Sequence, residues 1–472
     1  MSPFDKARYK RLLEGLEISE IPNSEALKAS RFDSEFWRKQ FIKDESLIKD
    51  KSETSPLRPL LKVFYRYPLF YGYEFTDSGI PVLKGEDICS SGLVLSKSGD
   101  HVTEKVSAQF PLTVVEEKDI IVSVRGSVGK VGLIPKTLAG SQISPNLIRL
   151  HPNSSYVRPE YLWCFLSCKI GQRYFDRFKM RTTQETIIAS DIGNFLIPLL
   201  SEELQKKIAA LINDALNLIH GSEDSLIKAE QTLMTELGLA DWTPPEPLSY
   251  SRNVKVVSAA GRFDAEYFAP RVQELIKKLS AQGLTLGNVA PLRKEYFRPK
   301  AGTPFDYIEI SDLNQFGETN STRLDGGEAP SRAKWHVRKG YIITSTVRPI
   351  RRLTALIQPE QDNFVCSSGF AVLQPKAVPS ELLLVYLRLP AICELMDLHT
   401  TASMYPAISV PNILALPFLK PSDKGTEKII SLVQSARAAR GSAYDLLERA
   451  KCAVEIAIEN SEVAALKFIT GD

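Results

Sequence analysis

Two stretches of the chain show the alternating three- and four-residue spacing of apolar residues that predicts long amphipathic helices. The first stretch runs from Ser201 to Gly238 and carries Leu204, Ile208, Leu211, Ala215, Leu218 or Ile219, Leu226, Ala229, Leu233 and Leu237. The second begins at Thr426 and carries Ile429, Val433, Ala436, Ala443, Leu447, Ala450, Val454 and Ala457. Gly221-Ser222 weakens the first stripe, and the charged Arg440 interrupts the second. We expect the two helices to pair with each other, with two unrelated surface helices as the alternative.

Short β-branched segments separated by Gly, Pro, Ser and Asp precede each of these helices and predict strands and turns. In the first half the segments are 80–83, 113–115, 120–124, 131–134 and 146–150, and in the second half they are 307–310, 341–344, 353–357 and 370–373. Each half is therefore rich in strands first and helical at its end.

The chain contains an internal repeat. The heptapeptide Arg31-Phe-Asp-Ser-Glu-Phe-Trp37 returns 231 residues later as Arg262-Phe-Asp-Ala-Glu-Tyr-Phe268. Further similar pairs are 119–125 with 340–348 and 159–166 with 379–387. The expected fold class is α+β, with two tandem mixed domains separated by a pair of long antiparallel helices that resemble a coiled coil.

Composition narrows the class of protein. The 472 residues include 59 Lys and Arg against 56 Asp and Glu, for a net charge of +3, and the mean hydropathy is -0.12. We expect no membrane association, because no apolar run approaches the roughly 20 residues that span a bilayer. The six cysteines are scattered without a Cys-x-x-Cys pair, which favours a reducing, cytoplasmic location.

The sequence offers no recognisable catalytic or metal-binding motif. It lacks a phosphate-binding P-loop, a His-Glu-x-x-His zinc motif, a Gly-x-Ser-x-Gly elbow and a dinucleotide fingerprint. Its five histidines are dispersed. We therefore predict no catalytic residue, no metal and no cofactor bound by the chain itself.

The polar segments that remain suit contacts with nucleic acid. The turn 125–130 offers Arg125, Ser127 and Lys130 with glycine backbone N–H groups between them, which suits a phosphate oxygen. A plain hairpin turn that needs glycine is the alternative. The other candidate DNA-binding residues lie in a counterpart turn and in the two loops that follow a helix in each half: Ser345, Arg348, Arg351 and Arg352, then Lys179, Arg181, Thr182, Thr183 and Gln184, then Thr400, Thr401, Ser403 and Tyr405.

These segments, taken in order, resemble the specificity subunits of type I restriction-modification systems. The resemblance rests on 79–88, 119–130, Tyr161-Leu162, Thr182-Thr183, Ile197-Pro198 and the helix 201–208, and in the second half on 307–312, 329–334, 345–349 and Leu416-Pro417. It implies an N-terminal segment packing on the helices (1–45), a first target-recognition domain (46–200), a first spacer helix (201–240), a Pro-rich linker (241–261), a second target-recognition domain (262–421) and a second spacer helix (422–472).

The resemblance also implies a function and partners. A specificity subunit is non-catalytic, binds a bipartite target in double-stranded DNA, and positions two methyltransferase subunits, which carry S-adenosylmethionine, for adenine methylation. Restriction/translocase subunits can join for cleavage. Two other readings stay open: an autonomous nuclease with an unrecognised active site, and a helical protein-interaction scaffold.

Overall fold

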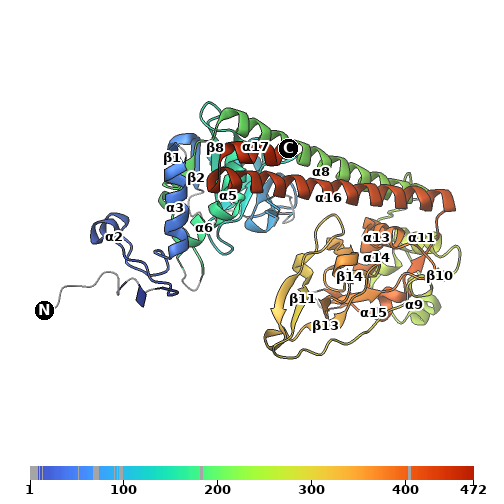
Figure 1. Cartoon of the computed structure of the whole chain (residues 1–472). Coiled ribbons are helices and arrows are strands. Elements are labelled where there is room, and N and C mark those ends of the chain that lie inside the picture. The colour runs from blue at the N-terminus through green and yellow to red at the C-terminus, as the bar shows by residue number, and fades with distance from the viewer. Residues whose placement is uncertain are drawn as a thin grey trace. The chain divides into compact units, whose positions relative to one another are not determined.

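The chain divides into two compact units in a computed structural model (Figure 1). Residues 1–218 and 441–472 form unit 1, and residues 219–440 form unit 2. The structure describes residues 9, 11–12, 14–51, 53–66, 74–89, 91–92, 94, 99–180, 184–401 and 406–471. The division falls inside both long helices, so each unit contains a part of each.

Unit 1 is built on an antiparallel sheet with the strand order β2-β8-β5-β6. A smaller sheet has the order β4-β3-β7, in which β3 and β7 are parallel. The strands are β1 (Thr54–Pro56), β2 (Leu61–Arg66), β3 (Ile80–Leu83), β4 (His101–Val102), β5 (Ile120–Ser123), β6 (Val131–Leu133), β7 (Gln142–Ile143), β8 (Leu147–Pro152) and β9 (Leu196–Pro198). The helices of at least five residues before the first long helix are α2 (Asn23–Ala29), α3 (Lys39–Lys51), α5 (Pro159–Ser167), α6 (Lys169–Phe178) and α7 (Ala189–Gly193).

Unit 2 repeats the core of this arrangement. Its central strand β14 pairs with β15 and β17, as β5 pairs with β6 and β8, and β11 runs parallel to β16, as β3 does to β7. The strands are β10 (Leu284–Thr285), β11 (Pro304–Ile308), β12 (Thr322–Asp325), β13 (Ala333–His336), β14 (Ile342–Ser345), β15 (Thr354–Leu356), β16 (Val365–Ser367), β17 (Phe370–Leu373), β18 (Thr400–Thr401), β19 (Ala407–Ile408) and β20 (Pro417–Phe418). The helices before the second long helix are α9 (Val254–Ala260), α10 (Ala265–Phe268), α11 (Pro270–Leu279), α12 (Leu286–Val289), α13 (Ser380–Arg388), α14 (Pro390–Asp397) and α15 (Val410–Ala415).

The two long helices are α8 (Glu202–Glu236) and α16 (Asp423–Glu459), and the predicted pairing between them is confirmed. In unit 2, Ser222 of α8 contacts Arg440 of α16, and Glu236, later in α8, contacts Ser422, earlier in the chain than Arg440. The two helices are therefore antiparallel there. All eight apolar positions predicted for α16 are buried. On α8, Ile219 of the predicted pair Leu218 or Ile219 is buried, whereas Ile212 is buried where the pattern had favoured Leu211, a shift of one position. A further helix, α17 (Glu462–Thr470), follows α16.

The two irregular positions of the helical stripes meet each other. Arg440 is fully buried, and its guanidinium donates to the hydroxyl of the fully buried Ser222. It also donates to Glu318, on the turn between β11 and β12, with Nε to Oε1 at 2.8 Å. The charged interruption in the second stripe is thus a buried contact between the helix pair and the sheet region of unit 2.

The hydrophobic core of unit 2 continues from the helices into the domain beneath them. Ala229 and Leu233 of α8 and Ile429 and Val433 of α16 belong to one buried cluster that also contains much of α13 and α14. This shared core holds the mixed domain of unit 2 against its parts of both long helices. The predicted α+β fold class is confirmed.

One local expectation differs from the structure. Residues 113–115 were expected as a strand, but Pro111–Thr113 forms a 3-10 turn, because Pro111 fixes a helical φ at its first position. The segment 241–261, expected as a linker, contains the short helix α9, which Asn253 caps at its start. Over the described residues, no helix combines the length and apolar character needed to cross a membrane.

Candidate nucleic-acid interface

The turn between β5 and β6 in unit 1 is shaped by the serine that ends β5. The Ser123 hydroxyl donates to the carbonyl of Ser127 and accepts from the backbone N–H of Lys130, at 2.9 Å. Gly126 and Gly129 both have positive φ, and a Cβ on Gly129 would lie 3.0 Å from that of Phe175. Glycine is required at Gly129 for both reasons. The side chain of Ser127, at the tip of the turn, is exposed.

A second loop, the one that follows α6, is hydrogen-bonded to this turn. Met180 and Thr186 pair with each other as the stem of a hairpin, and Arg125 pairs with Thr186. The backbone N–H of Gly126 donates to the carbonyl of Glu185 at 3.0 Å. The structure therefore brings together two segments predicted separately from the sequence. Gln184 is exposed in this hairpin, whereas Arg181, Thr182 and Thr183 lie outside the described residues.

The cations of the turn and of the neighbouring hairpin differ in whether they are ion-paired within the chain. Lys179 is paired with Asp176 at 2.9 Å and Glu185 at 3.3 Å. Burial opposes its charge, but these two carboxylates raise the pKa of Lys179. The ammonium of Lys130 donates to the carbonyl of Gly85 at 3.2 Å. Lys179 is thus neutralised by carboxylates of the chain, whereas among the described residues Lys130 has no ion pair.

Arg66, at the end of β2, adds a cation that the sequence did not point out. Burial first, and then the charge of Arg125, lower the pKa of the Arg66 guanidinium. Among the described residues, neither arginine has a carboxylate within ion-pair distance. The mutual repulsion of the two guanidinium groups would be relieved by an anion nearby. Sequence reasoning missed Arg66 because it lies almost 60 residues before the turn.

The other basic residues of α6 pair within unit 1. Arg173 is bonded to Asp44 through two hydrogen bonds, and Arg177 is paired with Glu45 at 2.6 Å and donates to the carbonyl of Phe36. These contacts hold α6 against α3. The cation-rich appearance of this helix in the sequence therefore reflects packing between two helices.

The equivalent turn in unit 2 also contains two left-handed residues, here without glycine. The hydroxyl of Ser345, which ends β14, donates to the carbonyl of Val347 and accepts from its N–H. Arg348 and Arg352 both adopt left-handed backbone conformations, with φ of 50° and 59°. The N–H of Arg348 donates to the carbonyl of Pro406 at 2.8 Å, as that of Gly126 does to Glu185. Left-handed φ costs a non-glycine residue roughly 1–2 kcal/mol, so a tertiary contact maintains this turn.

The hairpin that bonds to this turn carries the second set of predicted residues. Thr400 and Thr401 form β18, which pairs with β19. Val347 pairs with Ala407, and the N–H of Ile408 donates to the carbonyl of Thr346 at 2.9 Å. Thr401 is exposed and Thr400 half-buried, whereas Ser403 and Tyr405 lie outside the described residues. Both units therefore assemble the same two segments at one end of the central strand.

Arg351 and Arg352 differ in exposure and in their contacts. Arg351 is exposed. Arg352 donates to the carbonyl of Arg388 at 2.6 Å and is ion-paired with Glu230 of α8. Arg388 is itself buried, and burial followed by the charge of Arg352 lowers the pKa of Arg388 to about 10. Arg352 therefore anchors the turn to the long helix, and Arg351 is the more available cation.

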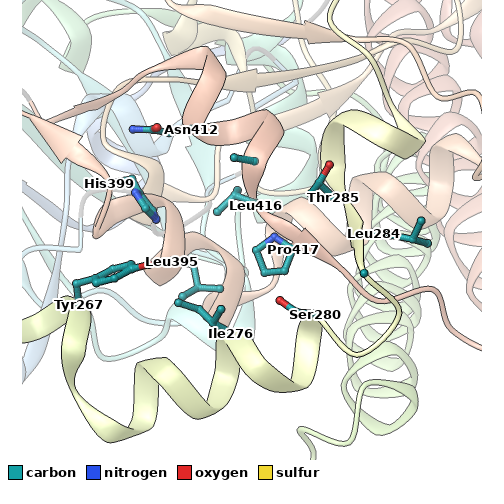
Figure 2. A pocket seen from close by; sticks show the side chains of 12 residues that line it. Tyr267, Ile276, Ser280, Leu284, Thr285, Leu395, His399, Asn412, Leu416 and Pro417 are labelled. Atoms are coloured by element: carbon teal, nitrogen blue, oxygen red, sulfur yellow. The ribbon is translucent and has the colours of Figure 1, made fainter. Parts of the chain in front are cut away.

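A cavity of about 330 Å³ lies elsewhere in unit 2, between α11, α14 and α15 (Figure 2). Its lining includes Tyr267, His399 and Asn412. The guanidinium of Arg262 donates to Nδ1 of His399 at 3.0 Å, and burial, then the charge of Arg262, lower the pKa of His399. Within the described part of the chain, no group of three or more His, Cys, Asp or Glu side chains is arranged to hold a metal ion.

Comparison with known proteins finds a family match within the first half of the chain. Residues 62–229 match the type I restriction modification DNA specificity domain. Two curated relatives are the type I restriction enzyme EcoBI specificity subunit of Escherichia coli, 24% identical over 145 residues (30% of each chain), and the putative type I restriction enzyme MjaX specificity subunit of Methanocaldococcus jannaschii, 25% identical over 212 residues (42% of this chain and 49% of the relative). The matches thus span about a third to a half of the length of these relatives.

Two solved structures are similar over most of the chain at low identity. The HsdS subunit of Thermoanaerobacter tengcongensis is 16% identical, with 87% of this chain and 97% of that chain covered and a TM-score of 0.28. The type I restriction-modification S subunit of M. genitalium is 14% identical, with 88% and 94% covered and a TM-score of 0.31. At these TM-scores the superpositions add nothing to the assignment, which rests on the sequence match. Residues 62–229 of this chain are therefore similar to the type I restriction modification DNA specificity domain.

Proposed function

We propose that this chain is the non-catalytic DNA-specificity subunit of a type I restriction-modification complex. Each unit would read one half of a bipartite target in double-stranded DNA. The observation that carries the proposal is the convergence, in both units, of a strand-ending turn with the hairpin that follows the second helix. The match of residues 62–229 to a DNA-specificity domain supports it.

The turn and the hairpin have different roles in this proposal. Arg66, Arg125 and Lys130 in unit 1 would contact phosphates, which contribute affinity without sequence information. The hydroxyl and amide side chains of the hairpin tips, such as Gln184 and Thr401, would contact base edges in the major groove. In unit 2, Arg348 and Arg351 would serve the first role, while Ser345, whose hydroxyl is bonded within the turn, shapes it.

The paired helices would hold the two readers apart. At a rise of 1.5 Å per residue, the 35 residues of α8 extend over roughly 50 Å. In unit 2 the reading turn is attached directly to this helix through Arg352 and Glu230, and the helix pair is attached to the sheet region through Arg440 and Glu318. Such attachments would fix the position of a reader relative to its helix.

The proposed partners are DNA and the other subunits of the complex. Two methyltransferase subunits, carrying S-adenosylmethionine, would methylate one adenine in each half of the target, and restriction/translocase subunits would join for cleavage. The chain would contribute recognition and positioning, with no chemical step of its own. Its place of action would be the cytoplasm.

DNA binding measured against salt concentration tests the phosphate contacts. The variant Arg66→Ala/Arg125→Ala should weaken binding to every duplex alike and reduce the slope of log affinity against log salt by about two, since each lost phosphate contact lowers it by about one. Lys136, exposed beyond the opposite end of β6, provides the matched control Lys136→Ala. An unchanged slope in the double variant would contradict the assignment.

Methylation mapping tests the base contacts. The chain is co-expressed with its methyltransferase, and the methylated sites in the host genome are sequenced. Substitutions at Thr182–Gln184 should change the sequence of one half-site, and substitutions at Thr400–Thr401 that of the other. If both sets leave the methylated sequence unchanged and only reduce its level, the hairpins do not read bases.

A further inference from the structure

The repeated heptapeptide forms the same small module in both units. In unit 1 the helix α2 ends at Ser30 in a left-handed conformation, and Arg31-Phe32-Asp33 follows. In unit 2 the helix α9 ends at Gly261, also left-handed, and Arg262-Phe263-Asp264 follows. Both helices have seven residues. The similarity therefore extends beyond the heptapeptide to the helix before it, where the two sequences differ.

Within each module the arginine and the aspartate form an ion pair with two hydrogen bonds. Arg31 donates to both oxygens of Asp33, at 2.7 and 3.1 Å, and Arg262 does so to Asp264, at 2.8 and 2.7 Å. The guanidinium of Arg31 lies 4.6 Å from the centre of the Phe36 ring. The charges of the arginine and the aspartate compensate each other, so neither is left over for an external phosphate.

Each module is also fixed to the helix that leads into the reading hairpin. In unit 1, Phe36 is buried against Phe178 at the end of α6, with ring centres 5.0 Å apart. In unit 2, Arg262 donates to the carbonyl of Leu398, just after α14. The modules are therefore anchored parts of their units.

The one large apolar side chain that each heptapeptide directs outward occupies the same place. Phe32 is 70% exposed and Phe263 is 83% exposed. Their neighbouring helices α2 and α9 bury no residue, and they carry exposed Leu27 and Val254. A seven-residue helix is too short to be stable by itself in water, so packing onto another surface would complete each module.

We propose that Phe32 and Phe263 are equivalent anchors for two copies of one partner subunit. Each phenyl ring would enter an apolar pocket of that subunit, flanked by the short helix. The duplication argues for a partner present twice, because one surface feature repeated in two units can bind two identical surfaces. The compensated Arg–Asp pairs argue for an apolar protein surface over a nucleic-acid backbone. The identity of the occupant rests on the proposed function, which makes it the methyltransferase subunit.

Native mass spectrometry and titration of the full chain with the purified methyltransferase subunit test this. The wild-type chain should bind two copies. Phe32→Ala and Phe263→Ala should each retain one tight site and weaken the other at least tenfold, as for a central aromatic anchor, and the double variant should lose both. Tyr156→Ala, which removes a 63% exposed aromatic outside the modules, is the matched control and should bind two copies. Because Phe32 and Phe263 are exposed, thermal unfolding of the variants should match that of the wild type.

Three results would overturn the proposal. One is two tight sites in the double variant. Another is loss of DNA affinity, with partner binding intact, which would assign the modules to DNA. The third is a dimer of the wild-type chain that the variants convert to a monomer, which would make a second copy the occupant. DNA binding by the chain alone is measured in parallel. If the chain binds DNA but never binds the methyltransferase, this inference fails and DNA recognition stands. If the wild-type chain does not bind DNA, the proposed function fails.

Discussion

Replacement of Arg440 should loosen the helix pair in unit 2, because the residue is a buried cation with specific partners. Its side chain is 1% exposed, and that of Glu318 is 20% exposed, with Nη2 and Oε1 2.6 Å apart. The guanidinium also bonds Ser222 of α8 and lies 4.8 Å from the centre of the Phe316 ring. Arg440→Ala would remove these contacts and leave the carboxylate of Glu318 in a poorly hydrated position.

The expected magnitude follows from this geometry. Removing one partner of a buried ion pair costs about 3–5 kcal/mol, because the other charge is left uncompensated. Since Glu318 is partly exposed, water can reach it, and we expect a loss near the lower limit, about 3 kcal/mol. Replacing the pair together, as in Arg440→Leu/Glu318→Gln, should restore most of this stability, because no charge remains unpaired.

Hydrogen exchange measures the effect locally, which matters because a chain with two units need not unfold in one step. Amides of α16 between Ile429 and Arg440 should exchange about a hundredfold faster in Arg440→Ala, as a 3 kcal/mol loss implies. Lys428→Ala, an exposed cation on the same helix, is the control. Exchange in Arg440→Ala within threefold of the wild type, or no recovery in the double variant, would refute the reasoning.

Four further substitutions test other parts of the structure. Gly129→Ala should lower the thermal stability of unit 1 and weaken DNA binding, because its Cβ would crowd Phe175 at positive φ. Gly221→Ala, whose Cβ would meet nothing within 4 Å, should instead stabilise α8 by about 1 kcal/mol. Equal effects of the two substitutions on the melting temperature would contradict both expectations. Arg348→Gly should stabilise unit 2 by about 1 kcal/mol by relieving a left-handed arginine while weakening DNA binding, so a parallel fall of both would count against a contact with DNA. Because burial lowers the pKa of His399 below its ordinary value of 6.5, the unfolded chain binds more protons, and unit 2 should lose stability as the pH falls below 6.5; unfolding followed against pH should show this dependence flattened in His399→Asn.

The proposed readers combine strain and charge in a way that a stable scaffold alone does not need. The turn of unit 2 holds two arginines at left-handed φ, and the turn of unit 1 places Arg125 beside Arg66. Both features cost free energy in the isolated chain. A bound phosphate would offset the repulsion between Arg66 and Arg125, which links this cost to the proposed function.

The sequence alone was sufficient to predict the two long helices and the two similar units. The period of the apolar residues predicted α8 and α16, because a helix that packs along one face must repeat its apolar residues with the period of its turns. The repeated heptapeptide and the order of strand-rich segments predicted two similar units. The converging turns and hairpins were also found as candidates, because their Gly, Arg and Thr residues cluster within a few positions of each other.

The role of each charged residue was decided only by the tertiary structure. Arg173 and Arg177 are cations of α6 that Asp44 and Glu45, more than 120 residues earlier in the chain, neutralise. Arg66 became a candidate only when β2 brought it to Arg125, and Arg440 changed from an interruption of a stripe to a buried contact when α8 placed Ser222 opposite it. The physical reason is that apolar periodicity is a local property of one element, whereas the state of a charge depends on whichever groups the fold brings within a few ångströms.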